Sequence, residues 1–399
     1  MIAARACSFP LLALLCLAFT TAIAAADPPT DQKRQQFRRL IEWADKDGDG
    51  RLSAEERADL RKLIEDLRSR RHEPLPQTVF PGRTDLYKLS PGEHERTVIE
   101  SFDLVDADRD KAIPLRITIP DGQDPAPVII FCHGALGSKD GSQPLVSHWT
   151  SHGYIVIQPT FGDSLSTLTP AERKRFRSLG ELVNSPRVLG QWDDRPRDVS
   201  HVIDSLDHLA ARIEALQGRI DADRIAVAGH SFGAHTTMLI AGLQLQPPGD
   251  VPVPDFRDDR VRATVMISPQ GPGKLITTDA YAALQGPMLM ITGDNDGTPI
   301  RGREKLAGPW RRQAFDHARP GDRYLLWIVD AHHNFGGISG ANANWPGAGP
   351  EAIDHVLYVK STTQAFFDAY LKADAQARRY LNSDQLETRT EGKARLTAR

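Results

Sequence analysis

Short apolar runs alternate with stretches of helical periodicity along most of this chain, and this alternation most constrains its fold. Several runs are apolar on both faces, as central parallel strands are when helices cover both sides of a sheet. The runs are 128–132, 154–158, 225–228, 263–267, 288–292 and 324–329. Two earlier β-rich runs, 98–104 and 113–119, predict a hairpin. The pattern predicts a doubly wound, mostly parallel α/β sheet with flanking helices.

The amino terminus has the pattern of a secretory signal peptide. Arg5 precedes an apolar run over residues 9–18, and small residues follow at 21–26. The run is shorter than the ~20 residues that span a bilayer, so we expect cleavage rather than a stable membrane span. A secreted or periplasmic location follows. The net charge of −3 over 399 residues gives no reason to expect a nucleic acid as partner.

The sequence Gly-His-Ser-Phe-Gly over residues 229–233 lies between an apolar run and a helical stretch. A serine in such a motif occupies a sharp strand-to-helix turn, where the close approach of the backbone requires glycine on both sides. The start of the following helix directs free N–H groups at the site, which favours developing negative charge. The motif therefore predicts Ser231 as a nucleophile.

A serine hydroxyl needs a base to take its proton and an acid to orient that base. In this kind of fold the acid and then the histidine follow the serine along the chain. Asp294 and Asp296 follow the run 288–292, and His332 and His333 follow the run 324–329. Both placements fit, because catalytic groups gather at the carboxyl ends of parallel strands. Motif spacing favours His333 over His332, and both aspartates stay open as the acid.

An oxyanion hole would combine the N–H of Phe232, directly after the serine, with an N–H from an earlier loop. The loop over residues 131–137 follows a predicted strand and contains two glycines, which let its backbone approach a substrate. We predict Ala135 as the second donor, with Leu136 as the alternative.

Several motifs together resemble the α/β-hydrolase superfamily, and more narrowly bacterial predicted dienelactone hydrolases and platelet-activating-factor-acetylhydrolase-like serine esterases. The matching segments are 113–115, 132–135, 149–154, 195–199, 229–233, 268–271, 292–296 and 333–337. The resemblance implies an α/β-hydrolase fold with Ser231, Asp296 and His333 as a triad that cleaves carboxylic esters through an acyl-enzyme. A serine stands where dienelactone hydrolases use cysteine, which favours a general esterase. The doubled histidine keeps His332 open as the base.

Two other functions remain as alternatives to an esterase acting on small-molecule or lipid-like esters. One is lipase, polyesterase or peptidase activity on the same triad, and segment 162–192 is the expected cap or lid over the site. The other is a non-catalytic calcium-binding scaffold. Ester cleavage by a serine needs no metal.

Residues 45–56 match the calcium loop of an EF-hand, with Gly50 at position six for the turn. The predicted Ca²⁺ ligands are Asp45, Asp47, Asp49, Arg51 (through its main chain), Ser53 and Glu56. Residues 106–110 resemble the first five positions of such a calcium loop. The rest of the loop pattern is missing, since Lys111 and Ile117 occupy positions six and twelve. We expect calcium to be structural or regulatory. EF-hands usually pair, so we expect this one to pack on the hydrolase or on a second copy in a homodimer.

The predicted domain order combines these features. Residues 1–26 form the signal peptide, 27–71 the EF-hand module, 72–92 a proline-rich linker, 93–385 the catalytic α/β domain and 386–399 a polar C-terminal tail.

Overall fold

The computed structural model describes residues 86–399, apart from residues 174, 177–178, 247–251, 298–305 and 341–346. The predicted signal peptide, the EF-hand with all six calcium ligands and most of the predicted linker lie outside the described residues.

Nine strands form one sheet in the part of the chain that the structure describes, in the order β1-β2-β4-β3-β5-β6-β7-β8-β9. Their bounds are β1 Arg96–Asp106, β2 Lys111–Pro120, β3 Ala126–Cys132, β4 Ile155–Pro159, β5 Ile220–His230, β6 Val261–Ile267, β7 Met288–Asn295, β8 Arg323–His332 and β9 Ala394–Ala398. Strands β4, β3, β5, β6, β7 and β8 run parallel to one another. The predicted hairpin β1–β2 pairs antiparallel at one edge, and β9 does so at the other.

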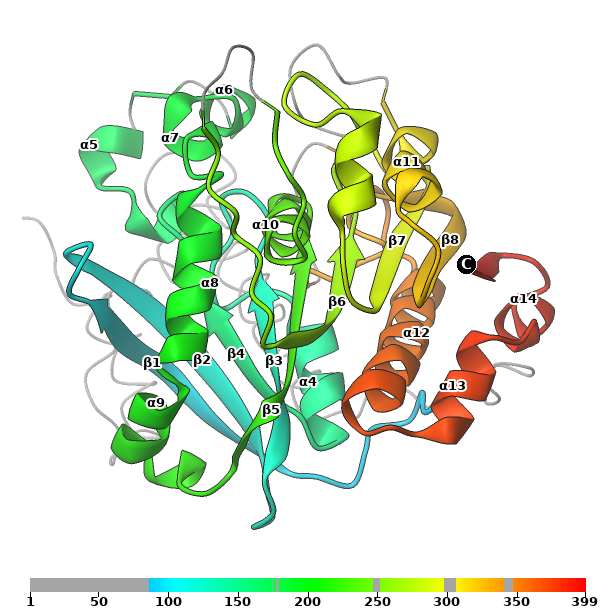
Figure 1. The fold of residues 1–399 in the computed structure, drawn as a ribbon, viewed down its shortest axis with the longest axis horizontal. Coiled ribbons are helices and arrows are strands. Elements are labelled where there is room, and N and C mark those ends of the chain that lie inside the picture. The colour runs from blue at the N-terminus through cyan, green and yellow to red at the C-terminus, as the bar shows by residue number, and fades with distance from the viewer. Residues whose placement is uncertain (1–85, 174, 177–178, 247–251, 298–305, 341–346) are drawn as a thin grey trace, which may run out of the picture. The chain divides into compact units, whose positions relative to one another are not determined.

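Helices cover both faces of the sheet (Figure 1). One face packs against α4 (Gln143–Ser151), α12 (Ile353–Leu371) and α13 (Ala375–Leu381). The other packs against α8 (Asp194–Asp204), α9 (Leu206–Arg212), α10 (Phe232–Ile240) and α11 (Gly308–His317). Strand β3 shows why its run is apolar throughout: Ile129 and Phe131 face the first layer, whereas Val128 and Ile130 face the second. This is the doubly wound, mostly parallel sheet that the alternating pattern predicts, and it is consistent with the α/β-hydrolase fold that the resemblance implies.

The fold extends beyond both predicted ends of the catalytic domain. Leu86 and Tyr87, predicted to belong to the linker, are buried in the core, and the Tyr87 hydroxyl donates to Asp368 at 2.9 Å. The predicted polar tail is also wrong, because residues 386–399 contribute the end of α14 (Gln385–Arg389) and the whole of β9. Leu386 and Ala394 are buried in that segment. An edge strand pairs through its backbone on one side only, so it needs little apolar sequence.

Segment 162–192, the predicted cap, consists of short helices connected by loops. These are η1 (Leu165–Thr167), α5 (Pro170–Arg173), α6 (Leu179–Val183) and α7 (Pro186–Leu189), and the three α-helices lie together near the amino end of α8 (Figure 1). Over the described ranges, no helix combines the length and the apolar character that crossing a membrane requires.

Candidate active site

Ser231 lies on the turn between β5 and α10 with φ 58° and ψ −115°, a conformation that side-chain-bearing residues rarely adopt. The flanking glycines make this turn possible. A Cβ on Gly229 would lie 2.2 Å from the carbonyl oxygen of Gly233, and one on Gly233 would lie 2.0 Å from that of Cys132. The backbone is therefore packed too closely for any other residue, and the strained turn projects the serine at the carboxyl end of β5.

A continuous chain of hydrogen bonds connects Ser231 to the predicted acid and base. The Nε2 atom of His333 lies 2.8 Å from the Ser231 Oγ, and its Nδ1 atom lies 2.6 Å from Asp296 Oδ1. Asp296 directly follows β7 and His333 directly follows β8, so the three residues meet at the carboxyl edge of the sheet. In the tautomer with its proton on Nδ1, His333 donates to Asp296 and offers Nε2 to the serine hydroxyl.

The two alternative residues have other partners. Asp294 accepts hydrogen bonds from the Asp330 N–H at 2.7 Å and from the Trp327 indole at 3.2 Å, which closes a surface turn. His332 is partly exposed. Its Cβ packs against Gly349 so closely that a Cβ on residue 349 would lie 2.2 Å from it. Within the described ranges no hydrogen bond connects Asp294 or His332 to Ser231.

Asp296 is fully buried and is held in its ionised form. Its Oδ2 atom accepts hydrogen bonds from the hydroxyls of Ser268 at 2.7 Å and Thr292 at 2.8 Å. Burial raises the pKa of Asp296, but the charge of Arg311 and the hydrogen bonds from His333 and Ser268 outweigh burial and lower it to about 2. The carboxylate is therefore available as the partner of His333 across the physiological pH range.

Arg311 on α11 is a buried cation beside this pair, and no sequence motif indicates it. Its Nε lies 3.0 Å from Asp296 Oδ1, and its other nitrogens donate to the carbonyl oxygens of Ser268 and Gly297. Burial and the charge of Arg311 lower the pKa of His333, whereas Asp296 raises it. Sequence offered no signal for this role, because exposed Arg312 adjoins Arg311 on the same helix.

The loop that carries the predicted oxyanion donors lies against the serine. A Cβ on Gly134 would lie 3.4 Å from the Ser231 Cβ. Ala135 and Phe232 both pack against a small apolar cluster formed by Leu168, Leu182 and Val188 of the cap segment. The Leu136 N–H already donates to Asp163 Oδ2 at 3.1 Å, whereas the Ala135 and Phe232 N–H groups have no acceptor among the described residues. This arrangement favours Ala135 over Leu136 as the second donor.

Four buried histidines stay neutral well below the ordinary histidine pKa of 6.5. The pKa is lowered to about 4 for His133 and His235, and to about 3 for His148 and His230. Burial is the largest cause in each case, since it disfavours the imidazolium ion. Nearby positive groups add to it, Arg195 for His133 and His235 among them.

We expect the fold to lose stability as the pH falls from 6.5 towards 4. The unfolded chain protonates these histidines below pH 6.5 while the folded protein does not, so the unfolded state binds more protons. Each histidine then lowers the free energy of unfolding by about 1.4 kcal/mol per pH unit in this window. Urea denaturation at pH 7, 6 and 5 measures the slope. A His148→Leu variant, remote from Ser231, should show a slope shallower by one proton, and a pH-independent stability would contradict the account.

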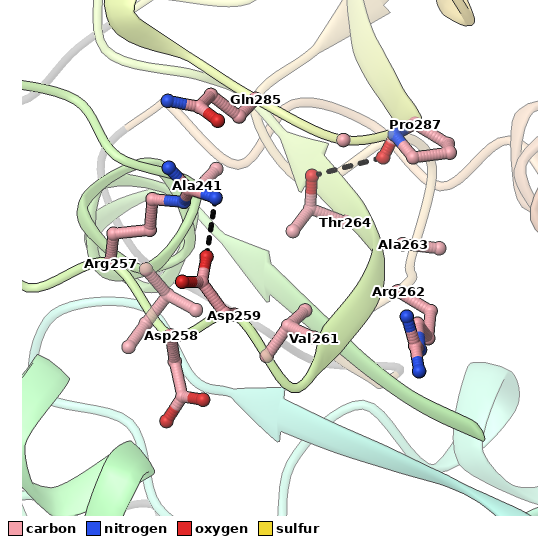
Figure 2. A pocket seen from close by; sticks show the side chains of 12 residues that line it. Ala241, Arg257, Asp258, Asp259, Val261, Arg262, Ala263, Thr264, Gln285 and Pro287 are labelled. Carbon is pink, nitrogen blue, oxygen red and sulfur yellow. Dashed lines mark hydrogen bonds and ion pairs between the residues drawn. The ribbon is translucent and has the colours of Figure 1, made fainter. Parts of the chain in front are cut away.

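A cavity of about 300 Å³ opens at the amino ends of the parallel strands, opposite the candidate catalytic residues (Figure 2). It lies where β6 begins and just before β7 begins, and an Arg257–Asp259 ion pair and a Thr264–Pro287 hydrogen bond line it. Functional groups of a parallel sheet gather at the carboxyl ends of its strands. This cavity, at the amino ends, contains none of the candidate catalytic residues.

No group of three or more metal-ligating side chains occurs among the described residues. The predicted calcium ligands are outside these residues, so the structure leaves the calcium prediction as it stands.

Comparison with known proteins gives one family. A family model described as chlorophyllase matches residues 86–247, a stretch from the start of the fold to just beyond α10 that includes the loop over residues 131–137, the cap segment and Ser231. The match covers less than half of the chain and ends before Asp296 and His333. A search of curated proteins found no match. The sheet topology is that of the α/β-hydrolase fold, and the family match supports a hydrolase of that superfamily.

Proposed function

We propose that this hydrolase cleaves carboxylic esters, with Ser231 as nucleophile, His333 as general base and Asp296 as the acid that orients His333. The observation that carries the proposal is the chain of hydrogen bonds from Ser231 through His333 to the buried Asp296, at 2.8 and 2.6 Å. The order of the three residues along the chain and their positions at the carboxyl ends of β5, β7 and β8 agree with the triad of this fold. The chlorophyllase match, which covers Ser231, also favours ester hydrolysis.

Acylation follows from this geometry. His333 Nε2 takes the hydroxyl proton as Ser231 Oγ attacks the ester carbonyl carbon, and the carbonyl oxygen becomes an oxyanion. The N–H groups of Ala135 and Phe232 donate to that oxyanion, and each such donor typically contributes about 10²–10³-fold to the rate. The imidazolium, paired with Asp296, then gives its proton to the alkoxide, which leaves as the alcohol. The acyl group remains on Ser231 as an ester.

Deacylation repeats these steps with water. His333 removes a proton from a water molecule as its oxygen attacks the acyl carbon, and the same N–H groups hold the second oxyanion. The proton then returns to Ser231 Oγ as the carboxylic acid departs. His333 must be neutral at the start of both halves, and its lowered pKa supports activity below pH 6.5.

The cap segment beside the oxyanion loop is apolar, which favours an apolar substrate. Leu168, Leu182 and Val188 form a cluster against which Ala135 and Phe232 pack. An apolar acyl or alcohol group that enters beside these residues would be removed from water, at roughly 25 cal/mol per Å² buried. We therefore propose small or lipid-like esters as the substrate class.

The rate of hydrolysis of p-nitrophenyl esters of increasing acyl length tests this proposal. We expect the wild type to hydrolyse them, and Ser231→Ala to lose at least about 10⁴-fold in kcat/KM while its thermal unfolding stays unchanged. A folded wild type that hydrolyses no ester of the panel would contradict the proposal.

We also propose that residues 45–56 bind Ca²⁺ in a structural or regulatory role outside the chemistry. Running the same esters with calcium and with a chelator examines this role. The triad itself requires no metal, so a structural role predicts an unchanged rate per folded molecule and an effect of the chelator on thermal unfolding. A regulatory role predicts instead that the chelator changes the rate per folded molecule, and no effect on either would contradict the proposal.

A further inference from the structure

Behind the oxyanion loop lies an ion pair with no access to solvent. The side chains of Arg195 on α8 and Asp163 both have 0% exposure. Two nitrogens of Arg195 donate hydrogen bonds to the carboxylate, Nε to Oδ1 at 2.9 Å and an Nη to Oδ2 at 2.7 Å. Burying two charges carries a large desolvation penalty, so such a pair is weak evidence for a stabilising role. The role of the pair is therefore sought in the groups that it holds in place.

The pair holds the backbone on both sides of Ala135. One Arg195 nitrogen donates to the His133 carbonyl oxygen at 2.7 Å, and the other donates to the Gly134 carbonyl oxygen at 3.3 Å. On the far side of Ala135, the Leu136 N–H donates to Asp163 Oδ2 at 3.1 Å. The two peptide units that meet at Ala135 are thus each fixed by one member of the ion pair.

Fixing the Gly134 carbonyl also fixes a predicted oxyanion donor. The Gly134 C=O and the Ala135 N–H belong to the same peptide unit, and in a planar trans peptide they point in opposite directions. Arg195 shares this carbonyl oxygen with His133 Nδ1 at 2.7 Å and the Gly137 N–H at 3.1 Å. Together these donors hold the oxygen on the side of Arg195, so the Ala135 N–H must point the other way. That direction is away from Arg195, on the side of the loop that carries no internal acceptor for this N–H.

Arg195 also contacts the residue that carries the other donor. Its guanidinium carbon lies 4.3 Å from the centre of the Phe232 ring and 4.5 Å from the centre of the Phe161 ring. These are cation–π distances, and a flat guanidinium suits this stacking. One buried side chain therefore touches both parts of the predicted oxyanion hole.

We propose that Arg195, held by Asp163, is a positioning residue that orients the Ala135 and Phe232 N–H groups for the oxyanion. The inference rests on the proposed ester hydrolysis at Ser231. Arg195 itself touches no substrate, because its side chain has no exposed surface. Its effect is on stabilisation of the transition state and not on substrate binding.

Arg195→Lys is the main test variant, since lysine keeps the charge beside Asp163 but lacks the planar fork that reaches the carboxylate and two carbonyls together. Asp163→Asn is the second variant, and it keeps the shape of the carboxylate while removing its charge. Arg197→Lys is the matched control on the same helix, where the exposed Arg197 stacks on Phe256. We expect kcat to fall at least about tenfold in the two test variants with KM within about threefold, and no change in the control.

A comparison of an ester with its thionoester separates positioning from a general loss of structure. N–H donors hold an oxyanion much better than a thiolate-like sulfur, so an intact hole favours the oxygen substrate strongly. A variant that merely contains less folded enzyme loses both activities equally, and its oxygen-to-sulfur ratio stays at the wild-type value. We expect this ratio, in enzyme titrated with a fluorophosphonate, to fall about tenfold in Arg195→Lys and in Asp163→Asn.

If a folded test variant keeps the wild-type oxygen-to-sulfur ratio, the positioning role of Arg195 is overturned, while the proposed ester hydrolysis at Ser231 stands. If the wild type hydrolyses neither ester, or if Ser231→Ala retains the activity, it is the proposed function that fails. The two failures are therefore distinguishable in one set of measurements.

Discussion

Replacing His333 by alanine is expected to reduce kcat/KM for ester hydrolysis at least about 10⁴-fold, whereas His332→Ala should retain activity within a few-fold. His333 is the histidine whose Nε2 lies 2.8 Å from the Ser231 hydroxyl. Without it no base takes the serine proton, and only the oxyanion donors and substrate binding remain to accelerate the reaction. His332 lies beside Gly349 at the surface end of β8.

The two variants control for each other because they remove the same side chain from adjacent positions. Steady-state rates with a p-nitrophenyl ester, together with thermal unfolding of each variant, give the comparison. Equal losses in both variants, or a larger loss in His332→Ala, would contradict the assignment of His333 as the base.

Asp296→Asn is expected to lose about 10⁴-fold in kcat and also to destabilise the fold. The loss of rate follows from the wrong tautomer of His333, since the asparagine NH₂ group can donate to Nδ1 and leave the proton on Nε2, and the neutral amide does not stabilise the imidazolium. The loss of stability follows from Arg311, whose buried guanidinium would be left without its counter-ion. Breaking a buried pair in this way typically costs about 3–5 kcal/mol.

A second substitution separates the two effects. In Asp296→Asn with Arg311→Met the unpaired charge is removed, so much of the stability should return while the rate stays low. Asp294→Asn is the matched control, because its carboxylate is exposed and only closes a turn with Asp330. Full activity in Asp296→Asn, or recovery of the rate in the double variant, would contradict the role proposed for Asp296.

The architecture was predictable because central parallel strands must be apolar on both faces. Strand β3 carries this signal at every position, from Val128 to Cys132, with each neighbour facing a different helical layer. Strand β9 lacked it, since its position at the sheet edge leaves Arg395 exposed and its pairing depends on backbone groups. The apolar pattern therefore predicts the middle of the sheet but not its C-terminal edge.

The candidate site was predictable to within one or two residues. The nucleophile motif is local, so its serine was identified by number. The acid and the base are defined by strand ends, and there sequence offers neighbours: Asp294 beside Asp296, and His332 beside His333. The two histidines are adjacent, so they point to different sides of the strand end. The two aspartates are separated by Asn295, where β7 ends, so alternation does not distinguish them and only the folded backbone shows which one faces His333.

The supporting charges were not predictable. Arg195, Asp163 and Arg311 are buried charged residues, a rare placement that leaves no periodic signal in the sequence. Each is defined by contacts across long sequence separations, such as the one between Arg195 and the His133 carbonyl. These residues come from loops and helix ends, where many exposed arginines and aspartates look the same.

The most direct test of the account is whether an acyl-enzyme analogue forms on Ser231. A fluorophosphonate reacts covalently with an activated serine, and mass spectrometry of the digested protein identifies the modified residue. We predict one adduct per molecule on the peptide that contains residues 229–233, at Ser231, and none in Ser231→Ala or His333→Ala within the same reaction time. A folded wild type that stays unlabelled, or an adduct on another residue that persists in Ser231→Ala, would contradict the central claim.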